Sequence, residues 1–252
     1  MKSMKKLPFI SILLCLALPL FVIADGEDVT YMVDDQYYEG YYVDAGKDAT
    51  LVIILHDWDG LTDYEKKRAH MLADAGFSAF AADLYGKGVR PTEVKDKRQH
   101  TGELYQDRAK MRALLNGAVV EAKSLGLNTE KMVAMGYCFG GAAVLEMARS
   151  GAEADAFITF HGGLSTPEGQ DYSKTQGMVM VFHGTADSMI TMQDFATLAT
   201  ELEDANIAHE MTTYGGAPHA FTVFGSDRYD QAADEASWAR FMAFLNAWNE
   251  QK

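Results

Sequence analysis

The residues best suited to covalent chemistry surround Cys138, in the segment Gly136-Tyr137-Cys138-Phe139-Gly140-Gly141. Residues 131–135 form an apolar run that predicts a strand, and residues 142–149 carry an apolar stripe that predicts a helix. A nucleophile elbow has this order, because small residues two positions before and after the nucleophile let strand and helix approach closely. A cysteine in this turn would lie at a helix N-terminus, where free N–H groups and the helix dipole favour the thiolate.

The same segment allows two other interpretations. Free cysteine is among the most buried residue types, so Cys138 could be a core residue beside a glycine-rich turn. Glycine-rich turns between a strand and a helix also bind phosphate groups. The rest of the chain has to decide between these interpretations and a nucleophile.

Two residues that could assist a cysteine nucleophile follow later strands. Asp187 comes shortly after the apolar run 178–182, and His219 follows the predicted strand 209–214. Nucleophile, acid and histidine, each after successive strands, is the chain order of the α/β-hydrolase triad. In such a triad His219 would accept the thiol proton and later return it, while Asp187 would orient the imidazole. Taken singly, Asp187 could be a turn or capping residue and His219 a solvated loop residue.

Three further histidines at strand ends raise the question of a metal. His56, His161 and His183 each end an apolar run, but the sequence contains no HxH or HExxH spacing. We therefore expect no metal and no cofactor.

The predicted elements alternate between strand and helix. Residues 29–43 predict a leading antiparallel hairpin with its turn near residues 34–36, and the runs 49–55, 77–85, 156–160 and 178–182 predict buried strands. Residues 62–75 and 191–206 predict helices, and residues 92–125 are expected to be largely helical. This pattern predicts an α/β fold with a mainly parallel sheet and helices on both faces.

The N-terminal residues have the composition of an export signal. A basic start is followed by an apolar run from residue 7 to residue 24, which ends in Val22-Ile23-Ala24. We expect residues 1–24 to be cleaved, leaving a single domain, 25–252, in the periplasm or outside the cell; an uncleaved anchor is the alternative. Cleavage would remove Cys15, so Cys138 would be unpaired in an oxidising compartment.

The charge restricts the class of partner. The formal net charge is −14, and loss of Lys2, Lys5 and Lys6 with the first segment would lower it by three, to −17. This acidic balance argues against nucleic acid or an anionic membrane as the partner. We expect a small-molecule substrate and a monomer or weak homodimer.

Several motifs together resemble the dienelactone hydrolase family of α/β hydrolases. The family's nucleophile motif GxCxGG is matched at Gly136, Cys138, Gly140 and Gly141. The other matching segments are His56-Asp57-Trp58-Asp59-Gly60-Leu61, Asp83-Leu84-Tyr85-Gly86-Lys87-Gly88, His183-Gly184-Thr185-Ala186-Asp187 and Tyr214-Gly215-Gly216-Ala217-Pro218-His219-Ala220-Phe221. The resemblance implies hydrolysis of an ester or lactone through a thioester formed on Cys138.

The resemblance also implies roles for individual residues. The N–H groups of Phe139 and Trp58 would form the oxyanion hole. Asp57 stands where the family has a glutamate that activates the cysteine. Lys87 and Val223 stand where dienelactone-type members hold the substrate carboxylate with two arginines, and lysine lacks the bidentate fork of arginine. Tyr85, Lys87 and Arg90 are the candidate substrate-binding residues.

Two other classes of function remain open. A catalytically silent α/β-hydrolase fold could act as a binding protein, although Cys138, Asp187 and His219 are all present. A thiol redox protein would usually need a second cysteine to resolve an oxidised one, and the mature chain would have none.

Overall fold

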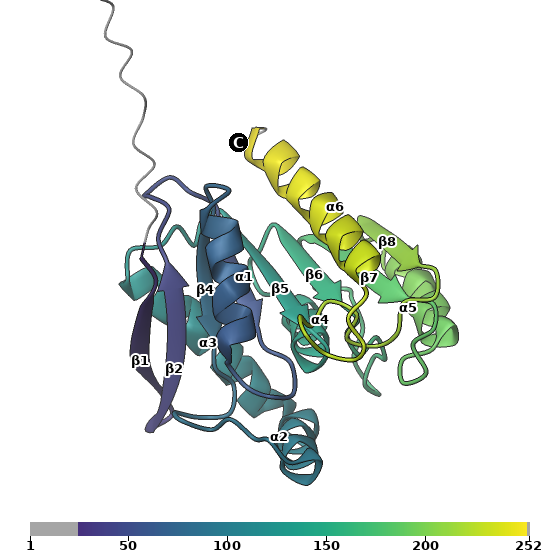
Figure 1. Cartoon of the computed structure of the whole chain (residues 1–252), viewed down its shortest axis with the longest axis horizontal. Helices are drawn as coiled ribbons and strands as arrows, with labels where there is room; N and C mark the ends of the chain where they lie inside the picture. The colour runs from purple at the N-terminus through teal and green to yellow at the C-terminus, as the bar shows by residue number, and fades with distance from the viewer. Residues whose placement is uncertain (1–24, 251–252) are drawn as a thin grey trace, which may run out of the picture.

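The structure is a computed structural model that describes residues 25–250 (Figure 1). It opens with the expected hairpin of β1 (Glu27–Val33) and β2 (Gln36–Val43). Asp34 and Asp35 form the turn with φ values of 47° and 61°, and two-residue hairpin turns need positive φ at both central positions. β2 continues the sheet by pairing antiparallel with β4.

Six parallel strands follow the hairpin. They are β3 (Leu51–Leu55), β4 (Ser78–Ala82), β5 (Met132–Tyr137), β6 (Ala156–Phe160), β7 (Met178–Gly184) and β8 (His209–Tyr214). The order across the eight-stranded sheet is β1-β2-β4-β3-β5-β6-β7-β8. The predicted fold class is therefore confirmed: the sheet is mainly parallel and begins with an antiparallel hairpin.

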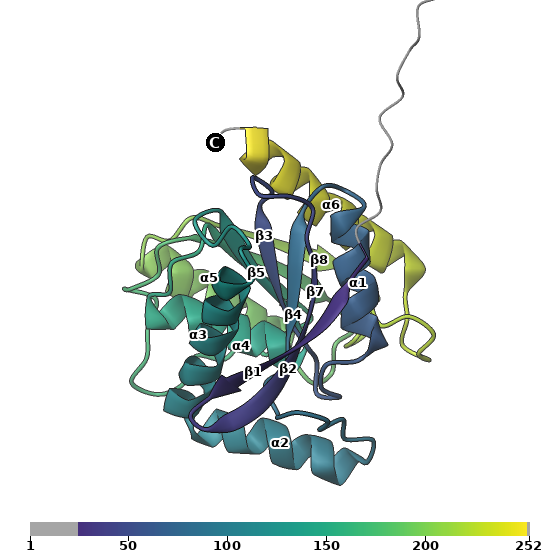
Figure 2. The same cartoon turned by 90° about the vertical axis from the view of Figure 1, so that its left-hand side faces the viewer.

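Helices cover both faces of this sheet (Figures 1 and 2). Leu51, Ile53 and Leu55 of β3 join the core on the side of α3 (Arg108–Ser124), α4 (Phe139–Ser150) and α5 (Met192–Asp204). Val52 and Ile54 join the core beneath α1 (Asp63–Ala73) and α6 (Gln231–Glu250). This alternation follows from the two-residue period of a strand, and it explains why β3 is apolar at every position.

The structure differs from the sequence predictions in three helical segments. Residues 92–125 form two helices, α2 (Val94–Gln106) and α3, because the Asp107 side chain accepts a hydrogen bond from the N–H of Lys110 and caps a new helix. α4 begins at Phe139 instead of residue 142, and α6 was not predicted. The expected signal segment, residues 1–24, lies outside the described residues.

The segment before β3 contacts the C-terminal end of α6. The Thr50 hydroxyl, just before β3, donates to the Asn249 side chain near the end of α6 at 3.1 Å. Within this part of the chain, none of the helices combines the length and the apolar character needed to cross a bilayer.

Candidate active site

Cys138 lies in a sharp turn between β5 and α4 that only glycine neighbours permit. Its backbone has φ 51° and ψ −109°, which is unusual for a residue with a side chain. A Cβ atom on Gly136 would lie 2.2 Å from the carbonyl oxygen of Gly140, and one on Gly140 would lie 2.2 Å from the carbonyl oxygen of Leu55. The three segments therefore pack backbone against backbone. The turn has the geometry expected of a nucleophile elbow and leaves Cys138 partly exposed.

The structure brings Cys138, His219 and Asp187 into one hydrogen-bonded row. His219 Nε2 lies 3.1 Å from Cys138 Sγ, and His219 Nδ1 lies 2.7 Å from Asp187 Oδ2. The other oxygen of Asp187 accepts hydrogen bonds from the N–H groups of Met189 and Ile190, at 2.8 and 2.9 Å. These bonds fix the carboxylate, which in turn fixes the imidazole.

The charges in this row stabilise one another. Burial opposes ionisation of Asp187, but the hydrogen bonds from His219 and from the N–H groups of Ile190 and Met189 hold the pKa of Asp187 below its ordinary value. Burial also opposes a charged His219, yet its hydrogen bonds to Asp187 and Cys138 outweigh burial and raise its pKa to about 10. A protonated His219 beside Cys138 is the partner that a thiolate needs.

The loop after β3 lies against the start of α4. A Cβ on Gly140 would meet the carbonyl oxygens of both Leu55 and His56, so residues 56–58 pass directly beside the elbow. His56 is fully buried; its Nε2 accepts the N–H of Leu84 at 3.0 Å, so Nδ1 carries the proton that is donated to the Asp57 carbonyl at 2.5 Å. Burial lowers the pKa of His56 to about 4, and it therefore acts as a neutral brace of this loop.

Asp57 is buried at the base of the same loop, with 8% of its surface exposed. Its side chain accepts the N–H of Asp59 at 2.8 Å. Burial and the charge of Asp59 raise the pKa of Asp57 to about 6, although Lys97 and His219 attract its charged form. Asp57 is thus in electrostatic contact with the triad. Behind it, burial and the charge of Asp57 raise the pKa of the fully buried Glu65 to about 8.

The three candidate substrate-binding residues lie in different surroundings. The Tyr85 ring is 5.7 Å from the Phe139 ring, and its hydroxyl donates to the Trp58 carbonyl at 3.4 Å. Lys87 donates to Thr30 on the hairpin at 2.9 Å. Arg90 pairs with Glu39 at 2.9 Å and with Asp83 at 3.7 Å. The structure therefore brings Tyr85 to the elbow, and it places Lys87 and Arg90 in a separate hollow beside β1 and β2.

Helix α2 adds residues that the sequence interpretation missed. His100 stacks on Tyr85 with ring centroids 5.0 Å apart, and Tyr105 packs edge-on against Phe139 at 5.4 Å. Lys97 pairs with Asp59 at 2.5 Å and lies over the ring of Trp58. Lys97, His100 and Leu104 recur at spacings of three and four residues, which is the signal that could have indicated one face of a helix directed at the site. α2 thus contacts Phe139, the residue that follows Cys138 at the start of α4.

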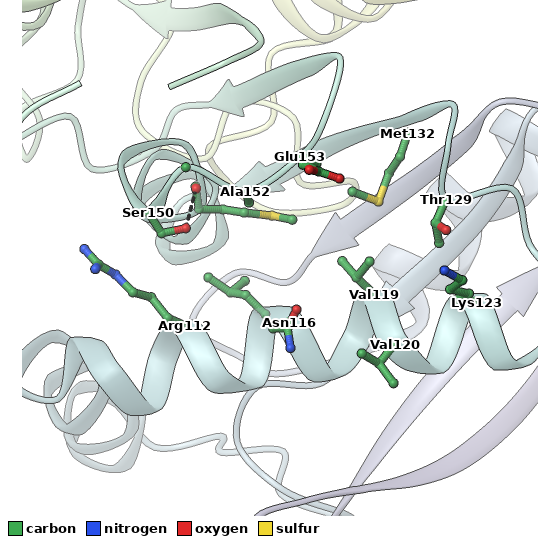
Figure 3. Close-up of a pocket in the computed structure, with 13 residues that line it drawn as sticks. Arg112, Asn116, Val119, Val120, Lys123, Thr129, Met132, Ser150, Ala152 and Glu153 are labelled. Atoms are coloured by element: carbon green, nitrogen blue, oxygen red, sulfur yellow. Dashed lines mark hydrogen bonds between the residues drawn. The ribbon is translucent and has the colours of Figure 1, made fainter. Parts of the chain in front are cut away.

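A groove of about 530 Å³ near the C-terminal end of α4 is separate from this site. Figure 3 shows it between α3, which contributes Arg112, Asn116, Val119 and Val120, and the last turn of α4 with Ser150. Cys138 precedes the first turn of α4, so the two sites lie at opposite ends of that helix. None of the three triad residues lines the groove.

Among residues 25–250, no group of three or more His, Cys, Asp or Glu side chains is arranged to hold a metal ion. The three strand-end histidines instead serve separate roles. His56 braces its loop, His161 contacts the ring of His219, and His183 packs against Phe195.

Comparison with known proteins shows the family to which this chain belongs. The model of the dienelactone hydrolase family matches residues 39–249, which include the elbow, Asp187 and His219. The chain belongs to the dienelactone hydrolase family. Family membership agrees with the sequence motifs and accounts for the mainly parallel sheet with its leading hairpin.

Individual relatives cover nearly the same length. The chain is 26% identical over 238 residues to carboxymethylenebutenolidase 1 of Cupriavidus pinatubonensis, covering 89% of this chain and 97% of that one. It is 28% identical over 211 residues to a probable 2-oxo-3-(5-oxofuran-2-ylidene)propanoate lactonase of a Bradyrhizobium species, covering 77% and 82%. A solved dienelactone hydrolase-like promiscuous phosphotriesterase from metagenomic libraries superimposes with a TM-score of 0.82 at 28% identity, covering 89% and 98%.

Proposed function

We propose that this dienelactone hydrolase-family protein hydrolyses carboxylic ester or lactone bonds through a thioester formed on Cys138. The observation that supports it most strongly is the row Cys138–His219–Asp187 at 3.1 and 2.7 Å, held on a glycine-lined elbow. The names of the relatives, a carboxymethylenebutenolidase and a probable lactonase, agree with this bond type.

The proposed reaction has two halves that use the same groups. The Cys138 thiolate attacks the carbonyl carbon, and the tetrahedral intermediate expels the alkoxide, which takes a proton from His219. His219 then removes a proton from water, and the resulting hydroxide attacks the thioester to release the acid and the free cysteine. A lactone opens in the first half, so a single hydroxy acid leaves after the second.

The negative oxygen of each tetrahedral intermediate needs donors that are already in place. The N–H of Phe139, at the start of α4, is one candidate, and the N–H of Trp58, in the loop packed against α4, is the other. Asp57, with its charge sensitive to His219, is the candidate for adjusting the state of the Cys138–His219 pair when substrate enters. Tyr85 and the rings around it offer the bound acyl group an aromatic wall.

We also propose that residues 1–24 direct export and are removed, so that the enzyme acts in the periplasm or outside the cell. The basic start and apolar run of the sequence support this proposal. An unpaired Cys138 is compatible with that compartment because no second cysteine is available in the mature chain to form an internal disulfide.

The function is tested by measuring hydrolysis of p-nitrophenyl acetate and of an uncharged aryl lactone by the wild type and by Cys138→Ala. We expect Cys138→Ala to lose activity on both substrates by roughly a thousandfold or more, with an unchanged melting temperature, and Cys138→Ser to retain a small residue of activity. Equal turnover by wild type and Cys138→Ala would refute the proposal. Absence of turnover in both, with dimedone labelling of a sulfenate on Cys138, would favour the redox alternative instead.

A further inference from the structure

A buried chain of hydrogen bonds runs from α1 to the neighbourhood of the catalytic histidine. Arg68 Nε donates to the Tyr64 hydroxyl at 3.3 Å, and that hydroxyl lies 2.7 Å from Thr222 Oγ1. Thr222 Oγ1 lies 2.8 Å from His161 Nε2. Arg68, His161 and Thr222 are fully buried and Tyr64 is partly buried, so the link between Thr222 and His161 is shielded from water.

The direction of this chain is fixed at its Arg68 end. A guanidinium can only donate, so the Tyr64 oxygen accepts from Arg68. Either hydroxyl can be the donor between Tyr64 and Thr222, and the direction between Thr222 and His161 Nε2 follows the tautomer of His161. Burial and the nearby charge of His219 lower the pKa of His161 well below its ordinary value, in agreement with a neutral ring.

The chain ends on the segment that carries the catalytic histidine. Thr222 follows His219 by three residues, and its carbonyl accepts a second bond from Arg68 at 3.0 Å. The His161 ring meets the His219 ring at 5.5 Å and 66°, in a T-shaped contact. His161 is itself held in a left-handed backbone conformation, φ 41°, with its N–H donating to the Phe182 carbonyl at 2.8 Å.

From these contacts we propose that His161 and Thr222 are positioning residues that hold the imidazole of His219 between Cys138 and Asp187. Thr222 fixes the orientation of the His161 ring, and that ring limits the rotation of the His219 ring. A neutral ring serves this role because a charged one would repel the protonated His219. The charge of Arg68 at the far end is balanced by Asp234 of α6, at 2.5 Å.

This inference rests on the proposed thiol hydrolysis, and its test uses a second reaction of Cys138 that needs no ester. Thr222→Val removes only the hydroxyl and keeps the shape of the side chain. We expect kcat for p-nitrophenyl acetate to fall about tenfold with KM nearly unchanged, because a small displacement of a catalytic group is costly. We expect the rate of Cys138 alkylation by iodoacetamide at pH 7 to fall in parallel, since a displaced His219 stabilises the thiolate less.

The matched control is Thr175→Val. Thr175 is, like Thr222, a buried threonine. Its hydroxyl donates to the backbone carbonyl of Ala148 at 3.1 Å, near the end of α4 that is distant from Cys138. The Thr175→Val variant should have a lower melting temperature but an unchanged kcat and alkylation rate. Thr222→Ser, which restores the hydroxyl, should recover both rates to within about twofold of the wild type if the hydroxyl acts by positioning.

A Thr222→Val protein that loses thermal stability but keeps the wild-type kcat and alkylation rate would overturn the proposal. If that variant does not fold, His161→Asn provides the decision, because asparagine tolerates the left-handed backbone but lacks the ring. A folded His161→Asn with wild-type kcat would equally overturn it. If esters are not hydrolysed by any form, the proposed function fails, while the alkylation rates still report whether Thr222 and His161 hold His219.

Discussion

At the scale of single residues, the proposed mechanism depends on the charge of His219. Its hydrogen bonds to Asp187 and Cys138 raise its pKa to about 10, which favours the imidazolium at neutral pH, and its Nε2 lies 3.1 Å from Cys138 Sγ. A serine triad differs, because its histidine takes the proton only as attack begins. We propose that an imidazolium beside Cys138 prepares it for attack before substrate arrives, and that the 2.7 Å contact to Asp187 holds the imidazole in this orientation.

Asp57 gives a test of this electrostatic picture through pH. Its pKa is raised to about 6, mainly by burial, from an ordinary value near 3.8. The folded state therefore binds more protons than the unfolded state, and stability contributed by Asp57 is lost as pH rises from about 4 through about 6. Asp57→Asn cannot ionise, so we expect its stability relative to the wild type to increase over that interval by about 2 kcal/mol.

Thermal or urea unfolding of both proteins at pH 4 and pH 7 measures this difference. A gap between the two proteins that is constant with pH would contradict the assigned pKa. The same variant reports on catalysis: if Asp57 assists Cys138, kcat should fall at pH 7 although stability rises.

The sequence could predict that Cys138, Asp187 and His219 lie close together, because each lies in the turn or loop that follows a strand. Cys138, Asp187 and His219 lie after β5, β7 and β8, and the ends of parallel strands meet at one edge of the sheet. His161 also follows a strand, but its role depends on Thr222 and on Tyr64 of α1, which is 158 residues from Thr222 in the chain. No local pattern indicates such a contact.

At the scale of elements, the approach of α4 to β3 holds the elbow in place. Gly140→Ala places a methyl group 2.2 Å from the Leu55 carbonyl oxygen, so α4 would have to move away from the sheet. We expect activity to fall more than about tenfold even in folded protein, because the Phe139 N–H moves with α4. Gly102→Ala on α2 is the matched control. A Cβ there meets no atom within 4 Å, and it should be active and slightly more stable.

Ester hydrolysis and thermal unfolding of both glycine variants provide the comparison. Wild-type activity in Gly140→Ala would show that the close approach of α4 to β3 is not required for catalysis.

Some elements were easier to predict than others for a physical reason. β6 and β8 have the predicted bounds because apolar or β-branched runs must be paired within a sheet. α2 and α3 share one charged, helix-favouring stretch, and only the Asp107 cap divides them. The face that α2 presents to Phe139 through Tyr105 depends on tertiary packing. The first turn of α4 was not predicted because it contains Gly140 and Gly141, and glycine has a low helix propensity.

At the scale of the whole molecule, the core on the α1 and α6 face of the sheet connects the hairpin, through Tyr41 and Val43, to Phe241 of α6. The buried pair Arg68–Asp234 joins α1 to α6, and Thr50 joins the start of β3 to Asn249. The acidic surface that encloses this core, with a formal charge of −14 for the full chain, favours solubility over binding to other polyanions. The C-terminal helix α6 is therefore held against both α1 and the start of β3.

The proposed export and cleavage of residues 1–24 predict where the mature protein begins. We expect protein isolated from its native host to begin at or near Asp25 and to be recovered in a periplasmic or extracellular fraction. Intact mass and N-terminal sequencing measure this directly. A mass that still includes residues 1–24 would favour the uncleaved anchor.

The central claim, a covalent thioester on Cys138, is tested most directly by trapping it. The protein is mixed with excess p-nitrophenyl acetate, quenched in acid within the first turnover and analysed by intact mass and peptide mapping. We predict a burst of one p-nitrophenolate per active site and the added mass of one acetyl group on the peptide that contains Cys138, both absent in Cys138→Ala. An acetyl group on another residue, or an equal burst in Cys138→Ala, would contradict the account.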